Sequence, residues 1–164
     1  MSAALQKVES KIVSRLEAAK TILTWQAQGQ QVVFTNGCFD LLHKGHIHYL
    51  CEAASLGQKL VLGVNSDASV QILKGPSRPI NSEESRAAML ACLFFVDLVV
   101  VFNEETPEIL IHTISPNILV KGGDYAINNI VGAEHVLANG GKVLALSFID
   151  GFSSTDIINK IKKT

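Results

Sequence analysis

The chain has 164 residues, 48% of them hydrophobic, and a formal net charge of −1. This size and apolar content are typical of one compact domain with its own core, and they exclude a disordered chain. The near-neutral charge argues against a protein that binds nucleic acid, because such proteins usually carry a basic excess. No apolar run approaches the roughly 18–20 residues of a membrane-spanning helix, and residues 1–20 lack the apolar segment of a signal peptide.

The pattern of apolar residues predicts helices and strands in alternation along the chain. The first element is one long helix over about 2–28, stopped by Gly29, and we expect residues 1–29 to pack as an N-terminal helix on a domain formed by 30–164. Strands are predicted at 31–36, 59–65, 97–102, 117–121 and 142–146. Between them we expect a helix from near Gly45, a polar loop at 74–79, and helices from Asn81 to about Phe94, from Thr106 to before Pro116, over 131–138 and from Ser153 to the C-terminus.

The predicted strands are short, continuous and rich in Val, Leu and Ile, which is typical of strands buried on both faces. Five such strands between helices predict a single doubly wound α/β domain around a parallel sheet. In this architecture ligands bind beyond the carboxyl ends of the strands. Polar residues that directly follow a strand are therefore the first candidates for function.

The segment after the first predicted strand carries the strongest functional signal and reads Thr35-Asn36-Gly37-Cys38-Phe39-Asp40-Leu41-Leu42-His43-Lys44-Gly45-His46. His43 and His46 are three residues apart across the start of a helix, which places both imidazoles on one side of its N-terminus. The unpaired N–H groups there favour anions, and Gly37 and Gly45 allow a ligand to approach the backbone closely. The pattern indicates a phosphate-binding cradle, although two histidines at this spacing also arise by chance.

Metal binding is the competing interpretation of these histidines. A zinc ion held by His43, His46, His48 and Cys38 is disfavoured, because His48 lies well around the helix from the other two and no carboxylate stands at ligand spacing. The three cysteines are odd in number and show no Cys-x-x-Cys spacing. We therefore expect no protein-held metal and no disulfide, and a reducing compartment, the cytoplasm.

The segment from Thr35 to His46 resembles the His-x-Gly-His signature of the cytidylyltransferase-like nucleotidyltransferase family, whose members carry it after the first strand of a Rossmann-like sheet. The family's second motif, a Ser/Thr-rich turn that opens a helix, is similar to Gly151-Phe152-Ser153-Ser154-Thr155. The resemblance spans about residue 30 to the end. Within the family, the chain resembles the heptose 1-phosphate adenylyltransferases in particular, because further motifs appear in the same order as in that group. These motifs are Asn65-Ser66-Asp67, Lys74-Gly75, Ser77-Arg78-Pro79, Val120-Lys121-Gly122-Gly123-Asp124-Tyr125 and Asn139-Gly140-Gly141.

The sequence also departs from the family. The Arg-Thr-Glu-Gly of choline- and glycerol-phosphate relatives is replaced by Phe148-Ile149-Asp150-Gly151. We therefore expect the phosphate contact of that arginine to be made by another residue or to be dispensed with. Many members are fused to a sugar kinase, and because no kinase segment is present here we expect the stand-alone form.

The resemblance implies a catalytic role for His43, His46 and Lys74. The residues that it implies in nucleotide or substrate binding are Thr35, Asn36, Gly37, Cys38, Phe39, Asp40, Gly45, Asn65, Asp67, Arg86, Lys121, Gly123, Asp124, Tyr125, Ser154 and Thr155. Structural alternatives stay open for several of them. Arg86 either reaches phosphates or pairs with Glu83, Ser154 and Thr155 either bind phosphates or only cap a helix, and the Cys38 thiol is expected to have no chemical role.

The reaction that the resemblance implies is attack of a sugar 1-phosphate on the α-phosphorus of ATP, with pyrophosphate leaving and no covalent enzyme intermediate. The expected acceptor is D-glycero-β-D-manno-heptose 1-phosphate, and Mg²⁺ is expected to be held mainly by the phosphates. Two alternatives remain, a cytidylyltransferase that uses CTP and a nucleotide-binding module without catalysis. A homodimer is a further expectation, with Trp25 packing either on a partner or on its own sheet.

Overall fold

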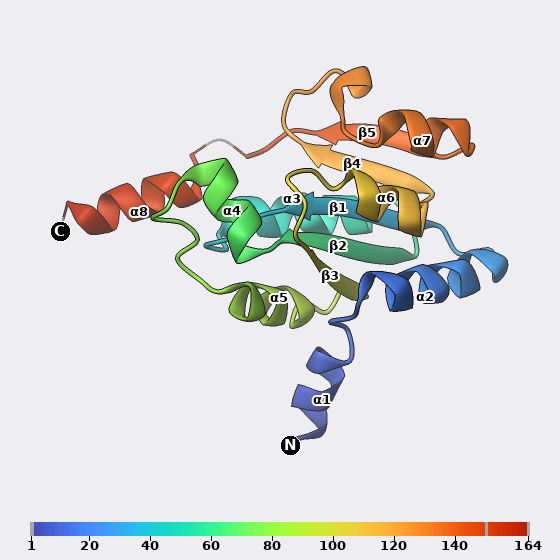
Figure 1. Ribbon diagram of the computed structural model, residues 1–164, viewed down its shortest axis with the longest axis horizontal. Helices are drawn as coiled ribbons and strands as arrows, with labels where there is room; N and C mark the ends of the chain where they lie inside the picture. The colour runs from blue at the N-terminus through green and yellow to red at the C-terminus, as the bar shows by residue number, and fades with distance from the viewer. Residues whose placement is uncertain (1, 150, 164) are drawn as a thin grey trace.

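The computed structural model describes residues 2–149 and 151–163. Its centre is a parallel sheet of five strands in the order β3-β2-β1-β4-β5 (Figure 1). The strands are β1 (Val32–Gly37), β2 (Lys59–Asn65), β3 (Leu98–Phe102), β4 (Ile118–Gly122) and β5 (Lys142–Leu146). The predicted α/β class, the parallel sheet and the five strands are confirmed.

Helices cover both faces of the sheet, and each face buries its own apolar cluster. One cluster joins the sheet to α2 (Arg15–Ala27), α6 (Glu108–Ile114) and α7 (Ala133–Ala138). The other joins it to α3 (Lys44–Ala54) and α5 (Glu83–Ala91). Alternate strand residues serve the two faces, so that Phe34 enters the first cluster and Val33 the second. This two-sided burial explains the continuous apolar strands in the sequence.

The strand order shows at which edge of the sheet a ligand is expected to bind. From β1 the chain proceeds outward to β2 and β3, and it then returns to the other side of β1 to form β4 and β5. The connections therefore diverge at the carboxyl ends of β1 and β4. In doubly wound folds this switch point is where ligands bind.

The N-terminal region differs from the single helix predicted over 2–28. It forms α1 (Ala3–Glu9) and α2, separated by an extended stretch that pairs with the outer edge of β3. The backbone N–H of Val13 donates to Val99 O at 3.0 Å, and Val99 N–H donates to Lys11 O at 2.8 Å. Ser14 then starts α2 through a capping box with Glu17. Helical spacing of apolar residues continues through the break, which is why periodicity alone missed it.

Packing within the domain accounts for the one tryptophan of the chain. Trp25 packs against the cluster under α2, and the Lys59 ammonium lies 4.9 Å from the centre of its ring. Ala18 and Ile22 of the same helix are fully buried. Of the two alternatives for Trp25, the structure therefore supports packing on its own sheet.

Three further boundaries depart from expectation. No element was predicted between the strand at 59–65 and the polar loop at 74–79, but α4 (Asp67–Lys74) forms there, capped by Ser66, so Lys74 ends a helix instead of lying in the loop. Helix α5 is capped by Ser82 and not by Asn81, because Asn81 is bonded to Asp40. Helix α6 begins after Pro107 and has no side-chain cap, so Thr106 does not serve as one.

The C-terminal part follows the prediction more closely. After the short 3₁₀ helix η1 (Ile127–Asn129), α7 and β5 form as expected, and Ser153 caps α8 (Ser154–Lys162). In Figure 1, α8 extends away from the sheet next to α4. Asp150, part of the departure from the family pattern, lies outside the described residues. Within the described part of the chain, no helix has the length and apolarity to span a bilayer.

Candidate active site

A cleft of about 340 Å³ opens at the carboxyl ends of β1 and β4. Its walls come from the loop after β1, from α3, from the end of α4, from the end of β4 and from the start of α8. The lining residues are Asn36, Gly37, Cys38, Phe39, Asp40, His46, Tyr49, Lys74, Lys121, Gly122, Tyr125, Phe148 and Ser154. A smaller cavity of about 220 Å³ adjoins it and shares Asn36, Lys121 and Tyr125 with it.

The two signature histidines form a stacked pair at the start of α3. His43 is the N-cap residue, and its Nδ1 accepts the backbone N–H of His46 at 3.3 Å. The two rings stack with centres 3.8 Å apart and an interplanar angle of 21°. The histidine spacing predicted from the sequence therefore does place both imidazoles together, with His43 ordering the helix start and His46 lining the cleft.

Gly45 packs tightly against other side chains of the protein. A Cβ atom at this position would lie 3.0 Å from the Cβ of Phe152 and 3.1 Å from Nδ1 of His43. The sequence suggested that this glycine leaves room for a ligand. The structure instead fills that space with the signature histidine and with an aromatic residue from the turn before α8.

Burial governs the ionisation of His46. Burial first, and then the nearby positive charges of His43 and Lys74, lower the pKa of His46 to about 4. The Leu41 backbone raises the pKa of His46, but this is the smallest of the effects. The Nδ1 atom of His46 is buried and makes no hydrogen bond. The ring is therefore neutral near pH 7, and an anion in the cleft would favour its charged form.

Lysines supply the permanent positive charge of the cleft. Lys74 reaches it from the end of α4, and Lys121 from the end of β4. Burial lowers the pKa of Lys121, because a charged ammonium loses hydration there. Two cations and a histidine that becomes charged beside an anion make this cleft suited to phosphate groups.

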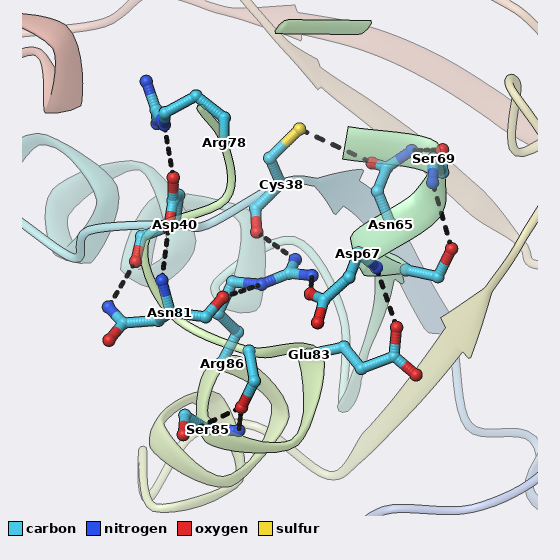
Figure 2. Close-up of polar contacts among 12 residues, drawn as sticks. Cys38, Asp40, Asn65, Asp67, Ser69, Arg78, Asn81, Glu83, Ser85 and Arg86 are labelled. Atoms are coloured by element: carbon cyan, nitrogen blue, oxygen red, sulfur yellow. Dashed lines mark hydrogen bonds and ion pairs between the residues drawn. The ribbon is translucent and has the colours of Figure 1, made fainter. Parts of the chain in front are cut away.

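Asp40 organises the loop that faces the cleft. Its carboxylate accepts hydrogen bonds from Arg78 Nε at 2.5 Å and from the backbone N–H groups of Ile80 and Asn81 at 2.8 and 3.0 Å (Figure 2). Burial alone raises the pKa of Asp40, but the bonds from Asn81, Arg78 and Ile80 outweigh burial and lower it. Asp40 is 1% exposed, and its role is to fasten the loop 78–81 to the signature segment.

The buried Arg86 and the partly exposed Asp67 form a second network, which Figure 2 shows below that of Asp40. Arg86 is fully buried and donates to Cys38 O at 2.6 Å, Asn81 O at 3.0 Å and Asp67 Oδ1 at 2.8 Å. Glu83 accepts from the backbone of Asp67 and is not the partner of Arg86. Neither Arg86 nor Asp67 lines the cleft, so the structure places both in the framework beneath it.

Several other predicted residues also stand behind the cleft lining. Thr35 shares a 2.6 Å hydrogen bond with Tyr49, and Asn65 donates to Ser69 at 2.9 Å. Gly123 has a φ of +112°, a conformation that favours glycine, and it begins the turn to the exposed Asp124. Thr155 lies at a separate cavity.

Sequence reasoning missed three lining residues, Tyr49, Gly122 and Phe148. Tyr49 had a usable signal, because it follows His46 by three residues and so shares its face of α3. Burial raises the pKa of Tyr49 to about 12, so it stays protonated as a partner of Thr35. Phe148 follows Ser147 after β5 and is itself apolar, so a search for polar residues after the strands passed over it.

Comparisons with known proteins extend over most of the chain. Residues 34–160 match the family model described as cytidylyltransferase-like. The chain is 52% identical over 153 residues to the bifunctional protein HldE of Paramagnetospirillum magneticum, a match that covers 93% of this chain and 31% of that protein. It is 51% identical to the protein of the same name from Vibrio cholerae, over 92% of this chain and 32% of that one. The chain thus spans about a third of the length of these curated relatives.

Solved structures show the same fold. A lipopolysaccharide core biosynthesis protein from Thermoplasma volcanium is 32% identical, with a TM-score of 0.59, over 74% of this chain and 98% of its own. A pantoate-beta-alanine ligase from Francisella tularensis, at 16% identity and a TM-score of 0.57, covers 93% of this chain and 78% of its own. At that identity the second likeness shows the fold alone.

Proposed function

Because the chain belongs to the cytidylyltransferase-like family and is therefore a nucleotidyltransferase, we propose that it transfers AMP from ATP to D-glycero-β-D-manno-heptose 1-phosphate and releases pyrophosphate. The observation that carries the proposal is the stacked pair of His43 and His46 at the start of α3, with His46 and Lys74 lining one cleft. The choice of sugar and base is supported by the ordered motifs that resemble the heptose 1-phosphate adenylyltransferases, and by the identity with HldE proteins over nearly the whole chain.

The proposed reaction is one in-line displacement. An oxygen of the sugar 1-phosphate bonds to the α-phosphorus of ATP. The bond from that phosphorus to the oxygen bridging to the β-phosphorus breaks, and its electron pair leaves on pyrophosphate. No side chain needs to act as a nucleophile. The chain supplies position and positive charge, from His46, Lys74 and Lys121, to the oxygens on which negative charge accumulates.

Mg²⁺ is proposed to arrive with the nucleotide. Among the described residues, no group of three or more His, Cys, Asp or Glu side chains is placed to hold a metal ion. Asp40, the carboxylate that lines the cleft, already accepts bonds from Arg78, Ile80 and Asn81. These residues do not make a metal cage, which fits an ion bound by phosphate oxygens and water.

The test is pyrophosphate release from the purified protein with Mg²⁺, the heptose 1-phosphate, and either ATP or CTP. His46→Ala should lower the rate of release by roughly 10²–10³-fold. The matched control is His48→Ala, which removes an exposed histidine of the same helix and should leave the rate unchanged. Release with CTP alone would overturn the assigned base. Binding of ATP with no release from any phosphorylated sugar would favour a binding module without catalysis.

The setting of the enzyme is part of the proposal. Cys38, Cys51 and Cys92 are free thiols, which supports a reducing compartment such as the cytoplasm. Leu16 and Leu23 of α2 are 70% and 65% exposed, and they offer an apolar face for a homodimer. Light scattering of the protein at two concentrations would measure its oligomeric state directly.

A further inference from the structure

Phe152, in the turn before α8, is an aromatic residue that the proposed reaction does not use. Among the residues that the structure describes, it is not part of the cleft lining, and it is 40% exposed. Its ring nevertheless stacks on that of His43, with the ring centres 6.4 Å apart and an interplanar angle of 25°. This separation lies within the range of interacting aromatic pairs. The C-terminal turn thus reaches the histidine signature through a side chain outside the cleft.

His43 has two stacked neighbours, because the centre of its ring also lies 3.8 Å from that of His46. Its Nδ1 accepts the backbone N–H of His46 at 3.3 Å, so in the neutral ring the proton is on Nε2. This bond requires the orientation of His43 that the structure shows. A rotation of the ring would remove both the cap of α3 and the surface on which His46 stacks.

The orientation of His46 depends on ring contacts of this kind. Its buried Nδ1 has no hydrogen-bond partner among the described residues. The ring of Phe39 meets it edge-on with the centres 5.5 Å apart, and His43 stacks on it. Hydrogen bonds at a ring nitrogen usually fix a functional histidine, and here ring packing takes their place. The position of His43 therefore governs that of His46.

Phe152 is itself fixed against the start of α3. A Cβ atom on Gly45 would lie 3.0 Å from the Cβ of Phe152, so the turn approaches the helix closely. The Lys44 ammonium lies 5.8 Å from the centre of the Phe152 ring, within the distance of a cation–π contact. Two residues after Phe152, the Ser154 hydroxyl donates to Leu41 O at 2.9 Å. The turn and the signature are therefore packed as one unit, although they are far apart in the sequence.

We propose that Phe152 is a positioning residue for the nucleotidyl transfer. Its ring holds His43 in the orientation that caps α3, and His43 in turn orients His46 toward the phosphates. Phe152 touches no reacting atom and acts through His43. The inference rests on the proposed function, because it assigns His46 a contact with the substrate. It gives the turn a task that is separate from the nucleotide contacts predicted for Ser154 and Thr155.

The first test is steady-state kinetics of Phe152→Leu, which keeps an apolar side chain but removes the flat ring. Its kcat should fall roughly five- to tenfold, since a misplaced catalytic group costs rate, while its KM for ATP should change less than about twofold. Phe152→Tyr keeps the ring and should restore kcat to within about twofold of the original protein. Phe94→Leu is the matched control, because Phe94 is 92% exposed at a separate cavity and its loss should leave kcat unchanged.

Two kinetic results would overturn the proposal. A raised KM for ATP with an unchanged kcat would show that the ring only seats α8 and its predicted nucleotide-binding residues. Equal losses of kcat in Phe152→Leu and Phe152→Tyr would show that the stacked ring is not what matters.

The second test needs no substrate and so separates this inference from the choice of sugar. Burial lowers the pKa of His43, so an NMR titration of Phe152→Leu should show that pKa rising toward its ordinary value and the ring signals of His46 shifting as well. Unchanged signals from both histidines would overturn the positioning role, even if the heptose 1-phosphate is adenylylated. Shifted signals in a protein that is inactive on the heptose would support that role and refute the sugar.

Discussion

Residues 38–40 and residues 43–46 adjoin in the chain, yet their polar groups are satisfied in different ways. The carbonyl of Cys38 and the carboxylate of Asp40 are bonded to Arg86, Arg78 and loop backbone. His46 instead stacks on His43 and has a buried nitrogen without a partner. The signature thus contains two kinds of residue. Cys38 and Asp40 belong to a bonded frame, and His46 belongs to the surface of the cleft. Under the proposed function, the groups bonded within the protein hold the loop, and His46 contacts the substrate.

The largest expected effect lies on the reactive side. His46→Ala should lower kcat by roughly 10²–10³-fold, as expected for the loss of one donor to a developing charge. Its free energy of unfolding should change little, because the His46 Nδ1 makes no hydrogen bond that the variant would lose. Steady-state kinetics and urea unfolding of the same preparation measure both quantities. A large loss of stability would show that His46 helps to hold the loop, and it would contradict the proposed difference between residues 38–40 and residues 43–46.

The frame should respond in the opposite way. Arg86→Met should lower the free energy of unfolding by about 2–4 kcal/mol, because it leaves the carbonyls of Cys38 and Asn81 without their donor. Asp67 is partly exposed and can regain water, so its lost ion pair adds less. Thermal or urea unfolding measures the change. Full stability with lost ATP binding would show instead that Arg86 serves the nucleotide.

The pH dependence of stability provides a further test of the role of His46. Its pKa is about 4 in the folded protein and near 6.5 when unfolded, so the unfolded chain binds the proton first as the pH falls. Protonation of His46 therefore costs no stability above pH 6.5, and the stability of the protein falls as the pH drops from 6.5 toward 4. His46→Gln should flatten that part of the stability curve. NMR titration of the ring should show its pKa rising when ATP binds, and an unchanged value would separate His46 from the phosphates.

The smallest expected effect concerns Tyr49, which is bonded within the protein to Thr35 and also lines the cleft. Tyr49→Phe removes the 2.6 Å hydrogen bond to Thr35 and should cost about 1 kcal/mol of stability. Activity should fall by less than roughly threefold, because the ring still fills the cleft wall. Kinetics and unfolding together test this expectation. A loss of activity comparable to that of His46→Ala would make the Tyr49 hydroxyl a substrate contact.

The fold was largely accessible from the sequence, because the signals that set it are local. Short Val-rich strands and caps such as Ser153 identified the sheet and α8, and the family resemblance is confirmed by the match over 34–160. The break between α1 and α2 was missed, since it depends on pairing with Val99, far away in the chain. The Ser14 and Glu17 capping box was the local clue.

The site was accessible only in part, for the same physical reason. Spacing along one helix predicted the arrangement of His43 and His46. It could not tell which charges would be consumed by partners from other segments. Arg78 and Arg86 lie close together in the sequence, but Arg86 donates from Nε, Nη1 and Nη2 to the frame, whereas Nη2 of Arg78 is buried and unpaired. Only tertiary contacts separate them, so the role of each residue at the site remains a prediction.

The stretch that joins α1 to α2 has a consequence for solubility. By pairing with Val99 it covers the outer edge of β3, a strand that would otherwise present free N–H and C=O groups along the rim of the sheet. Exposed rims of this kind recruit strands from other molecules and promote aggregation. The stretch between α1 and α2 therefore acts as a cover against edge-to-edge association, and a chain shortened to begin at Ser14 would lose that protection while keeping every residue of the cleft.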